Sequence, residues 1–364
     1  MKIACVIHSL DGGGAERVLA SLASRLASRE HAVTLVMLDD GTKANHELDD
    51  SVQVRHLNLM ADSHHIIQKI RNTRMRVSRM RGTLRELAPD VVLSFCDRTN
   101  ILTLMAARTL AIPVVVSERS DPSQQRLGLL WEHLRNRTYR QAQAIVALTE
   151  TSANHLRQRL GVDVTVIPSA VDRPPFPSDR VRACEHRRIL GAGRLEAEKG
   201  FDRLIHAFHS IANAHPDWTL RILGEGSQRE SLQQQINTLG LTERVTLHGW
   251  VKPVWEELGA ASLFALPSRY EGFPSALLEA MAMGVPTVAV DCESGPRAVI
   301  QNENQGLLVP NETAALAAGI LRLIDDESER EQLGQAATDV VDRFSWESMV
   351  DQYETLLRSV IFNA

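Results

Sequence analysis

The chain has 364 residues, 44% of them hydrophobic and 23% charged, a balance that excludes a disordered or fibrous protein. At roughly 100–200 residues per domain, this length predicts two domains, each large enough to bury its own core. The formal net charge is −5, but residues 1–180 hold 24 basic and 19 acidic side chains, whereas the remainder holds 16 and 26. A basic N-terminal half could favour an anionic partner, or the two halves could differ by chance.

The cysteines and the apolar segments bear on the cellular compartment of the protein and on its contact with membranes. The four cysteines are far apart and form no CxxC pair, so neither a disulfide framework nor a zinc site is predicted. The apolar run after Lys2 is too short for a signal peptide, and no segment approaches the ~20 apolar residues that cross a bilayer. We expect a cytoplasmic protein whose contact with a membrane is peripheral.

Short apolar runs alternate with helical periodicity through the first half of the chain. Buried strands are predicted at Lys2–Ile7, Val33–Leu38, Val91–Phe95, Val114–Ser117, Ala144–Leu148 and Thr165–Ile167. Helices are predicted at Ala15–Ser28, 66–87, Asn100–Leu110 and Glu132–Arg140. This alternation is typical of a parallel sheet covered by helices on both faces.

A cluster of prolines between residues 168 and 177 indicates a linker, after which the same alternation restarts. Strands are predicted at Arg188–Gly191, Thr219–Leu223, Val245–His248, Leu263–Pro267, Thr287–Val290 and Gly306–Val309. Helices are predicted at Phe201–Ala214, Gln228–Leu239, Val254–Ala260, Ala276–Ala282 and Thr313–Asp325. We therefore predict two successive α/β domains, with ligands beyond the carboxyl ends of the strands.

The first candidate site motif is the glycine-rich segment Asp11–Arg17, between the first strand and the first helix. Glycines allow backbone N–H groups to approach a ligand closely, and a helix N-terminus favours negative charge. The segment lacks the GxGxxG dinucleotide pattern. A purely structural turn is the alternative explanation.

The second motif, Gly191–Gly200, follows the first strand of the second domain. Arg194 and Lys199 bracket a short loop there, and either could bind a phosphate. Such cations could neutralise a departing nucleoside diphosphate without a metal. Solvated surface charges are the alternative.

The third motif is Glu271–Glu279, where Pro274 and Ser275 are typical helix-start residues. The helix then begins between the two carboxylates, and its first N–H groups could bind a phosphate. Glu279 could accept hydrogen bonds from ribose hydroxyls and Glu271 from a sugar hydroxyl. Carboxylates stabilised by the helix dipole are the alternative.

Together these motifs resemble glycosyltransferase family 4. The shared features are Gly-Gly-Gly-Ala-Glu-Arg, Gly-Arg-Leu-x3-Lys-Gly, the Gly-Glu-Gly at 224–226, and the specific stretch 267–289 containing Glu-Gly-Phe-Pro. The resemblance runs over nearly the whole chain. It implies the GT-B fold of two facing Rossmann-like domains, with an acceptor domain at 1–170, a nucleotide-sugar domain at 171–345 and a C-terminal helix at 346–364 that packs on the first domain. Trp346 and Tyr353 are expected to make that contact.

The resemblance also implies a retaining, metal-independent transfer of a hexose or N-acetylhexosamine from a nucleoside diphosphate sugar, UDP being the favoured nucleotide. By position, Arg194 and Lys199 would hold the diphosphate, Glu279 the ribose, and Glu271 would lie near the sugar. Further nucleotide-sugar contacts are expected from Gly13, Gly14, Gly193, Gly272, Phe273, Pro274, Ser275 and Ala276. The leaving phosphate would take the acceptor proton, so no protein base is required.

One position departs from the family. Where many relatives have a histidine in a Glu-His-x-Asn segment, this chain has Arg119. An arginine keeps its proton, so a role here must be electrostatic or that of a hydrogen-bond donor.

Residues 66–87 combine an apolar stripe with an arginine-rich remainder and no acidic residue before Glu86. Such a helix could lie on anionic headgroups or bind the diphosphate of a polyprenyl-linked acceptor on the inner face of the cytoplasmic membrane, although a solvated helix face is the alternative. The candidate residues are Lys69, Arg71, Arg74, Arg79, Arg81 and Arg85. Nucleic acid is a poor partner because aromatic residues do not interleave with the arginines.

The histidines predict no metal site, since His64 and His65 are adjacent and His206 and His209 have no evident third ligand. The chain also resembles bacterial glycosyltransferases of envelope or lipid-linked glycans, which implies a role in cell-surface polysaccharide or oligosaccharide synthesis. Two rivals to such a transferase remain. One is a GT-B nucleotide-sugar epimerase, and the other is a non-catalytic sugar-nucleotide-binding protein.

Overall fold

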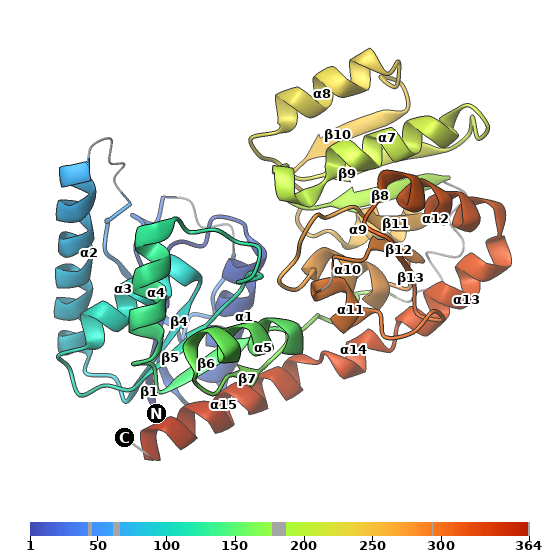
Figure 1. Ribbon diagram of the computed structural model, residues 1–364. Coiled ribbons are helices and arrows are strands. Elements are labelled where there is room, and N and C mark those ends of the chain that lie inside the picture. The colour runs from blue at the N-terminus through green and yellow to red at the C-terminus, as the bar shows by residue number, and fades with distance from the viewer. Residues whose placement is uncertain (43–45, 61–65, 177–186, 293, 363–364) are drawn as a thin grey trace. The chain divides into compact units, whose positions relative to one another are not determined.

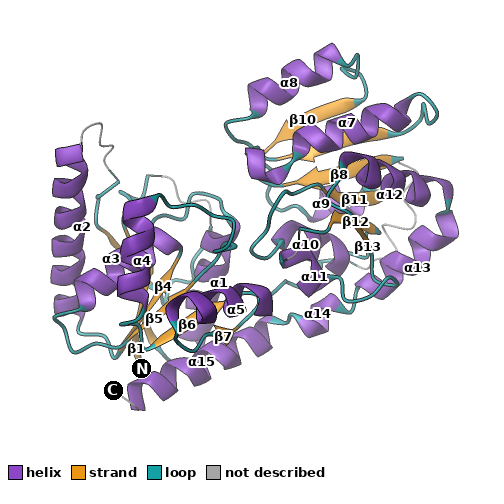
Figure 2. Ribbon diagram, viewed as in Figure 1, coloured by secondary structure: helices purple, strands orange, loops and turns teal. Residues whose placement is uncertain are grey.

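The computed structural model describes residues 1–42, 46–60, 66–176, 187–292 and 294–362, which leaves His64 and His65 outside the described residues. Residue contacts divide the chain into two compact units, Met1–Ser169 with Glu347–Ala364, and Ala170–Trp346. Each unit is a parallel sheet covered by helices (Figures 1 and 2). This is the predicted α/β, Rossmann-like architecture.

The first unit has a seven-stranded sheet in the order β3-β2-β1-β4-β5-β6-β7. Its strands are β1 (Lys2–Ile7), β2 (Ala32–Met37), β3 (Gln53–His56), β4 (Val91–Phe95), β5 (Val114–Ser117), β6 (Ala144–Ala147) and β7 (Thr165–Val166). Its helices are α1 (Gly14–Ser28), α2 (Ile66–Leu87), α3 (Asp97–Ala107), α4 (Leu129–Tyr139), α5 (Glu150–Leu160) and α15 (Trp346–Phe362).

The second unit has a six-stranded sheet in the order β10-β9-β8-β11-β12-β13. Its strands are β8 (Arg188–Ala192), β9 (Thr219–Leu223), β10 (Val245–Gly249), β11 (Leu263–Leu266), β12 (Thr287–Val290) and β13 (Leu307–Val309). Its helices are the 3-10 turn η1 (Ala197–Lys199), α7 (Phe201–Ala212), α8 (Arg229–Thr238), α9 (Trp255–Gly259), α10 (Ser275–Ala282), α11 (Gly295–Val299), α12 (Thr313–Asp325), α13 (Glu327–Ala337) and α14 (Val340–Arg343).

The central strands read as apolar runs because both of their faces are buried. Every residue of β4 and β5 is buried, and β1 is buried except for its first residue. In the first unit, apolar residues of α2, α3, α4 and α5 share one core with Ala4 and Val6 of β1. Since successive strand residues point to opposite faces, Ile3 and Cys5 face the other side of the sheet.

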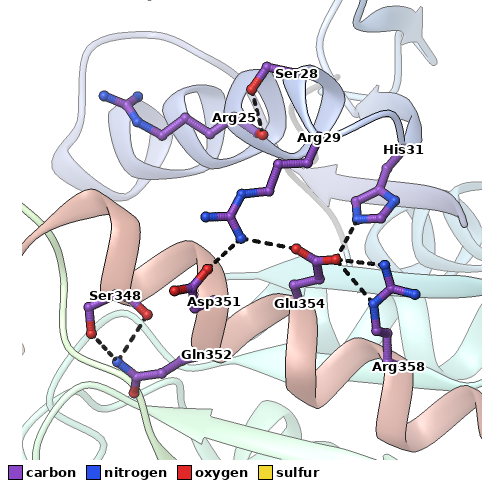
Figure 3. Close-up of polar contacts among 9 residues, drawn as sticks. All are labelled: Arg25, Ser28, Arg29, His31, Ser348, Asp351, Gln352, Glu354 and Arg358. Atoms are coloured by element: carbon purple, nitrogen blue, oxygen red, sulfur yellow. Dashed lines mark hydrogen bonds and ion pairs between the residues drawn. The ribbon is translucent and has the colours of Figure 1, made fainter.

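The last helix, α15, is fixed to the first unit by buried and charged contacts. Tyr353 is fully buried, and its hydroxyl lies 3.0 Å from the Oγ atom of Ser117. Glu354 accepts hydrogen bonds from Arg29 at 3.0 Å and from Arg358 at 2.7 Å and 3.0 Å (Figure 3). The hydrogen bonds from the arginines lower the pKa of Glu354 to about 2. Residues from Glu347 onward therefore belong with the first unit, whereas Trp346 groups with the second.

Candidate active site

In each unit the strand order reverses between two neighbouring strands. β1 lies beside β4 in the first sheet, and β8 lies beside β11 in the second. The chain leaves such a pair in opposite directions, and open α/β sheets bind their ligands at the carboxyl ends of those strands. The second and third predicted motifs follow β8 and β11, so the sheet order brings them to one switch point.

A close backbone approach joins the two loops. Gly200, which follows η1, has φ +67°, and a Cβ atom at this position would lie 2.2 Å from the carbonyl oxygen of Pro267. Only a glycine fits both the left-handed conformation and this approach. The loop after β8 can therefore lie directly against the loop after β11.

Arg269 binds the two loops together. Its guanidinium forms two parallel bonds to the Asp202 carboxylate, at 2.8 Å and 2.7 Å, and its backbone N–H donates to the Glu198 carbonyl at 2.7 Å. The hydrogen bonds from Arg269 lower the pKa of Asp202. Neither residue was predicted from the sequence, although an aspartate in the first turn of the helix after Lys199-Gly200 was an available signal.

The two loops place Lys199 against Glu271. The Lys199 Nζ atom lies 2.7 Å from the Glu271 Oε1 atom, and the Ser268 hydroxyl donates to the same oxygen at 2.7 Å. The Glu271 side chain is only 7% exposed and that of Lys199 is 21% exposed. A mostly buried cation and carboxylate thus meet at the switch point, and Ser268 is a further residue that the sequence reasoning missed.

Arg194 lies on the same loop in a more open position. Its guanidinium is 3.2 Å from the Glu198 carboxylate, and 66% of its side chain is exposed. The preceding Gly193 has φ +157° and donates its N–H to the Leu223 carbonyl of β9. The structure therefore holds the backbone of this loop in place and leaves the Arg194 side chain accessible.

The helix α10 begins in the Glu271 loop. Pro274 is its N-cap residue and supplies no side-chain cap, so the first N–H groups of the helix, on half-buried Ser275 and Ala276, can accept an anion. Gly272, Phe273 and Pro274 are buried.

A ring contact and a buried carboxylate mark how this loop is held. The Phe273 ring packs edge-on against Phe344, with centroids 5.4 Å apart. Glu279, on the second turn of α10, is 7% exposed. The loop and the start of α10 are therefore held by the core of the second unit.

In the first unit, Gly13 and Gly14 lie at the N-terminus of α1, directly after β1. A Cβ atom on Gly13 would lie 2.0 Å from a carboxylate oxygen of Glu16, which also pairs with His8 at 3.0 Å. The glycine allows the Glu16 carboxylate to fold over the start of the helix.

Arg119 follows β5 at the carboxyl edge of the same sheet. Its Nη2 atom donates to Ser169 at 2.6 Å, and the guanidinium lies 4.8 Å above the Phe95 ring. The Tyr353 hydroxyl also interacts with the guanidinium, but the Nε and Nη1 atoms are buried and have no hydrogen-bond partner among the described residues. Burial lowers the pKa of Arg119 because it desolvates the charged form. Two buried donors are thus left for a ligand or for water.

A buried polar network holds the strand end beside Arg119. The Glu118 carboxylate is 1% exposed and accepts a hydrogen bond from Tyr139 at 2.8 Å. Tyr139 in turn accepts one from Asn100 at 3.1 Å. Burial, reinforced by the charge of Asp97, raises the pKa of Glu118 to about 7.

The arginines of α2 divide into two groups. Arg81 is half-buried and donates to the Met105 and Ala106 carbonyls at the end of α3, so it serves the fold. The other candidates, Arg71, Arg74, Arg79 and Arg85, are exposed. The side chain of Lys69 lies outside the described residues.

The described residues contain neither a membrane-spanning helix nor a cluster of metal ligands. None of their helices is both long and apolar enough to cross a membrane. Nowhere in the described ranges do three His, Cys, Asp or Glu side chains gather as a metal site requires.

The protein is similar to known glycosyltransferases along most of its length. It is 28% identical over 337 residues to a GalNAc-α-(1→4)-GalNAc-α-(1→3)-diNAcBac-PP-undecaprenol α-1,4-N-acetyl-D-galactosaminyltransferase of Campylobacter jejuni, covering 92% of this chain and 91% of that one. It is 35% identical over 290 residues to an exopolysaccharide phosphotransferase of Streptomyces coelicolor, covering 78% of this chain but spanning only 30% of that protein.

A solved structure of HepE from Anabaena, in complex with UDP and glucose, has a TM-score of 0.81 at 22% identity, covering 99% of this chain and all of that one. Residues 12–173 match the sequence model described as Glycosyltransferase Family 4, and residues 176–340 match that of Glycosyl transferases group 1. The two matches lie end to end on two parallel-sheet units, and the chain belongs to glycosyltransferase family 4, with the GT-B fold.

Proposed function

We propose that this glycosyltransferase moves a hexose or N-acetylhexosamine from a UDP-sugar, with retention of configuration, to a lipid-linked glycan acceptor in bacterial cell-surface polysaccharide or oligosaccharide synthesis. The observation that carries this proposal is the meeting of Lys199, Glu271 and the uncapped start of α10 at the β8/β11 switch point. A cation and a free helix N-terminus suit a diphosphate, and a buried carboxylate suits the hydroxyls of a sugar.

Leaving-group charge is the main barrier that this arrangement addresses. When the bond between the sugar and the diphosphate breaks, negative charge grows on the phosphate oxygens. Lys199, the accessible Arg194 and the N–H groups of Ser275 and Ala276 would stabilise that charge. The released phosphate oxygen would take the acceptor proton, so we assign no protein base and no metal to the step.

We assign the remaining donor contacts by the chemistry of their side chains. Glu271 would accept a hydrogen bond from a sugar hydroxyl, and Glu279 would accept hydrogen bonds from the ribose. Gly13 and Gly14 would bind a sugar or phosphate through their backbone, and the two buried donors of Arg119 suit an oxygen-rich ligand.

The acceptor and its location are argued from the first unit. The exposed arginines of α2 suit a diphosphate or an anionic headgroup. The undecaprenyl-linked acceptor named for the Campylobacter jejuni relative supports a polyprenyl-diphosphate acceptor. We therefore propose that the protein acts peripherally on the inner face of the cytoplasmic membrane.

Nucleotide release tests the proposal. Purified protein would be given UDP-, GDP- and ADP-sugars, each with and without a bacterial lipid extract. Release from a UDP-sugar that requires the extract is the expected result. Release without any acceptor, together with conversion of the sugar, would favour an epimerase, and no release from any donor would favour a non-catalytic binding protein.

A further inference from the structure

Two adjacent leucines are left in water at the start of α4. Leu129 is 94% exposed and Leu130 is 65% exposed, whereas Leu127, just before them in the sequence, is only 7% exposed. A single exposed leucine is ordinary, but two adjacent exposed leucines lose the favourable free energy that burial of apolar surface would give on folding. This pair takes no part in the proposed transfer, and its exposure requires a separate explanation.

Further exposed apolar residues lie at the same edge of the first unit. α2, α3 and α4 each follow a strand of one parallel sheet, so each begins at its carboxyl edge, and α3 contacts both of the others (Figure 1). In the first half of α2, Ile70 is 48% exposed and Met75 is 40% exposed. Exposed apolar side chains that gather at one edge mark an interaction surface more reliably than scattered ones.

The exposed charged residues that flank these apolar side chains in the sequence are basic. Arg71 and Arg74 alternate with the exposed apolar residues of α2, and Arg126 is exposed just before the leucines. Glu132 is the acidic residue closest to the pair in sequence, and it is paired with Arg135 at 2.8 Å and also with Arg159. Exposed apolar side chains flanked by exposed arginines have the composition of segments that lie in a membrane interface.

We propose that Leu129 and Leu130 insert into an anionic lipid bilayer while Arg71, Arg74 and Arg126 contact its headgroups. The proposal rests on the proposed function, because a lipid-linked acceptor gives the contact its purpose. Arg119 and the Gly13–Gly14 turn also lie at the carboxyl edge of this sheet. A bilayer held at that edge would present the diphosphate of the acceptor next to them.

Flotation of the full-length protein with vesicles tests the insertion. The vesicles would contain phosphatidylcholine with or without phosphatidylglycerol. We expect the variant Leu129→Ser/Leu130→Ser to bind at least about tenfold more weakly than wild type, because it removes the inserted apolar groups. Phe362→Ser is the matched control, since Phe362 is 92% exposed at the end of α15 and should have no effect.

A second variant pair keeps the test independent of stability. A tryptophan in place of Leu129 should be quenched by brominated lipid, and a tryptophan in place of Phe362 should not. Arg71→Gln/Arg74→Gln should weaken binding only to vesicles that contain phosphatidylglycerol. Equal binding by wild type and the double-leucine variant, or equal quenching at both positions, would overturn the proposal. Failure of any vesicle to bind, with the leucines required instead for a protein complex, would also overturn it.

The outcomes separate this inference from the proposed transfer. Vesicle binding that depends on the leucines, with no nucleotide release from any donor, would leave the bilayer contact standing and refute the transferase proposal. Transfer to the lipid extract that is unchanged in the double-leucine variant would refute the bilayer contact alone.

Discussion

Replacing Lys199 with alanine separates the catalytic use of this residue from its structural use. At the observed 2.7 Å, the attraction between Lys199 and Glu271 is about 6 kcal/mol at an effective dielectric constant of about 20. Desolvation of both groups offsets most of this attraction, and the partly exposed lysine is screened further. The substitution leaves the Glu271 carboxylate with Ser268 as its neutral hydrogen-bond partner. We expect a loss of roughly 2–3 kcal/mol in the free energy of unfolding and a fall in turnover of about 100- to 1000-fold.

The double variant Lys199→Ala/Glu271→Gln distinguishes the two effects. It removes the uncompensated charge, so most of the unfolding free energy should return, but the diphosphate still lacks its cation and the sugar lacks the Glu271 carboxylate, so turnover should stay low. Urea unfolding followed by tryptophan fluorescence reports the stability, and initial rates of nucleotide release with the active donor report the turnover. Recovery of turnover together with stability would refute the reasoning, because Lys199 would then serve only to neutralise Glu271.

Three other substitutions test the surrounding structure. Glu354→Gln should lower the free energy of unfolding at pH 7 by about 1–2 kcal/mol, an amount already reduced because solvent screens the exposed Arg358. Because the pKa of Glu354 is lowered to about 2, thermal unfolding should show this difference shrinking as the pH falls from about 4.5 towards 2, and a constant difference would contradict the assignment. In Glu118→Gln, the variant should gain stability relative to wild type as the pH rises from about 4.5 to about 7, because the raised pKa of Glu118 makes its deprotonation costly in the folded state, and the difference should level off above pH 7; parallel unfolding curves against pH would count against it. Gly200→Ala should cost roughly 2–4 kcal/mol and lower turnover, whereas Gly240→Ala, with the same φ of +67° and no atom within 4 Å of the new Cβ, should cost only about 1 kcal/mol in urea unfolding.

The strands were predictable where both faces are buried, because such strands consist of consecutive apolar residues. β1, β4 and β12 begin and end at the predicted residues for this reason. The edge strand β3, Gln53–His56, was not predicted, because all four of its residues are exposed and it has no apolar signal. The start of α3 was predicted at Asn100 but lies at Asp97, where no side chain caps the helix. Helix ends without a capping residue leave little trace in a sequence.

The candidate site was predictable as a set of motifs but not as a set of contacts. The motif spacing identified the loops after β8 and β11. Local sequence does not determine which strands are neighbours in a sheet, so the contact between Lys199 and Glu271 could not be predicted. The arginine stripe of α2 shows the same limit. Helical periodicity could not reveal that Arg81 bonds to the end of α3 while Arg71 and Arg74 stay exposed.

The Lys199–Glu271 pair has a consequence for ligand binding under the proposed function. The loops that carry these residues are joined by the Gly200 approach and by Arg269, so the ammonium group is held in place before a donor arrives. Little conformational entropy then remains to be lost on binding. The bound diphosphate must, however, compete with Glu271 for the same ammonium group. A ligand with a single negative charge competes poorly at this distance, whereas a diphosphate that also contacts the start of α10 can share Lys199 with the carboxylate. The pairing would therefore favour nucleoside diphosphate sugars over monophosphates.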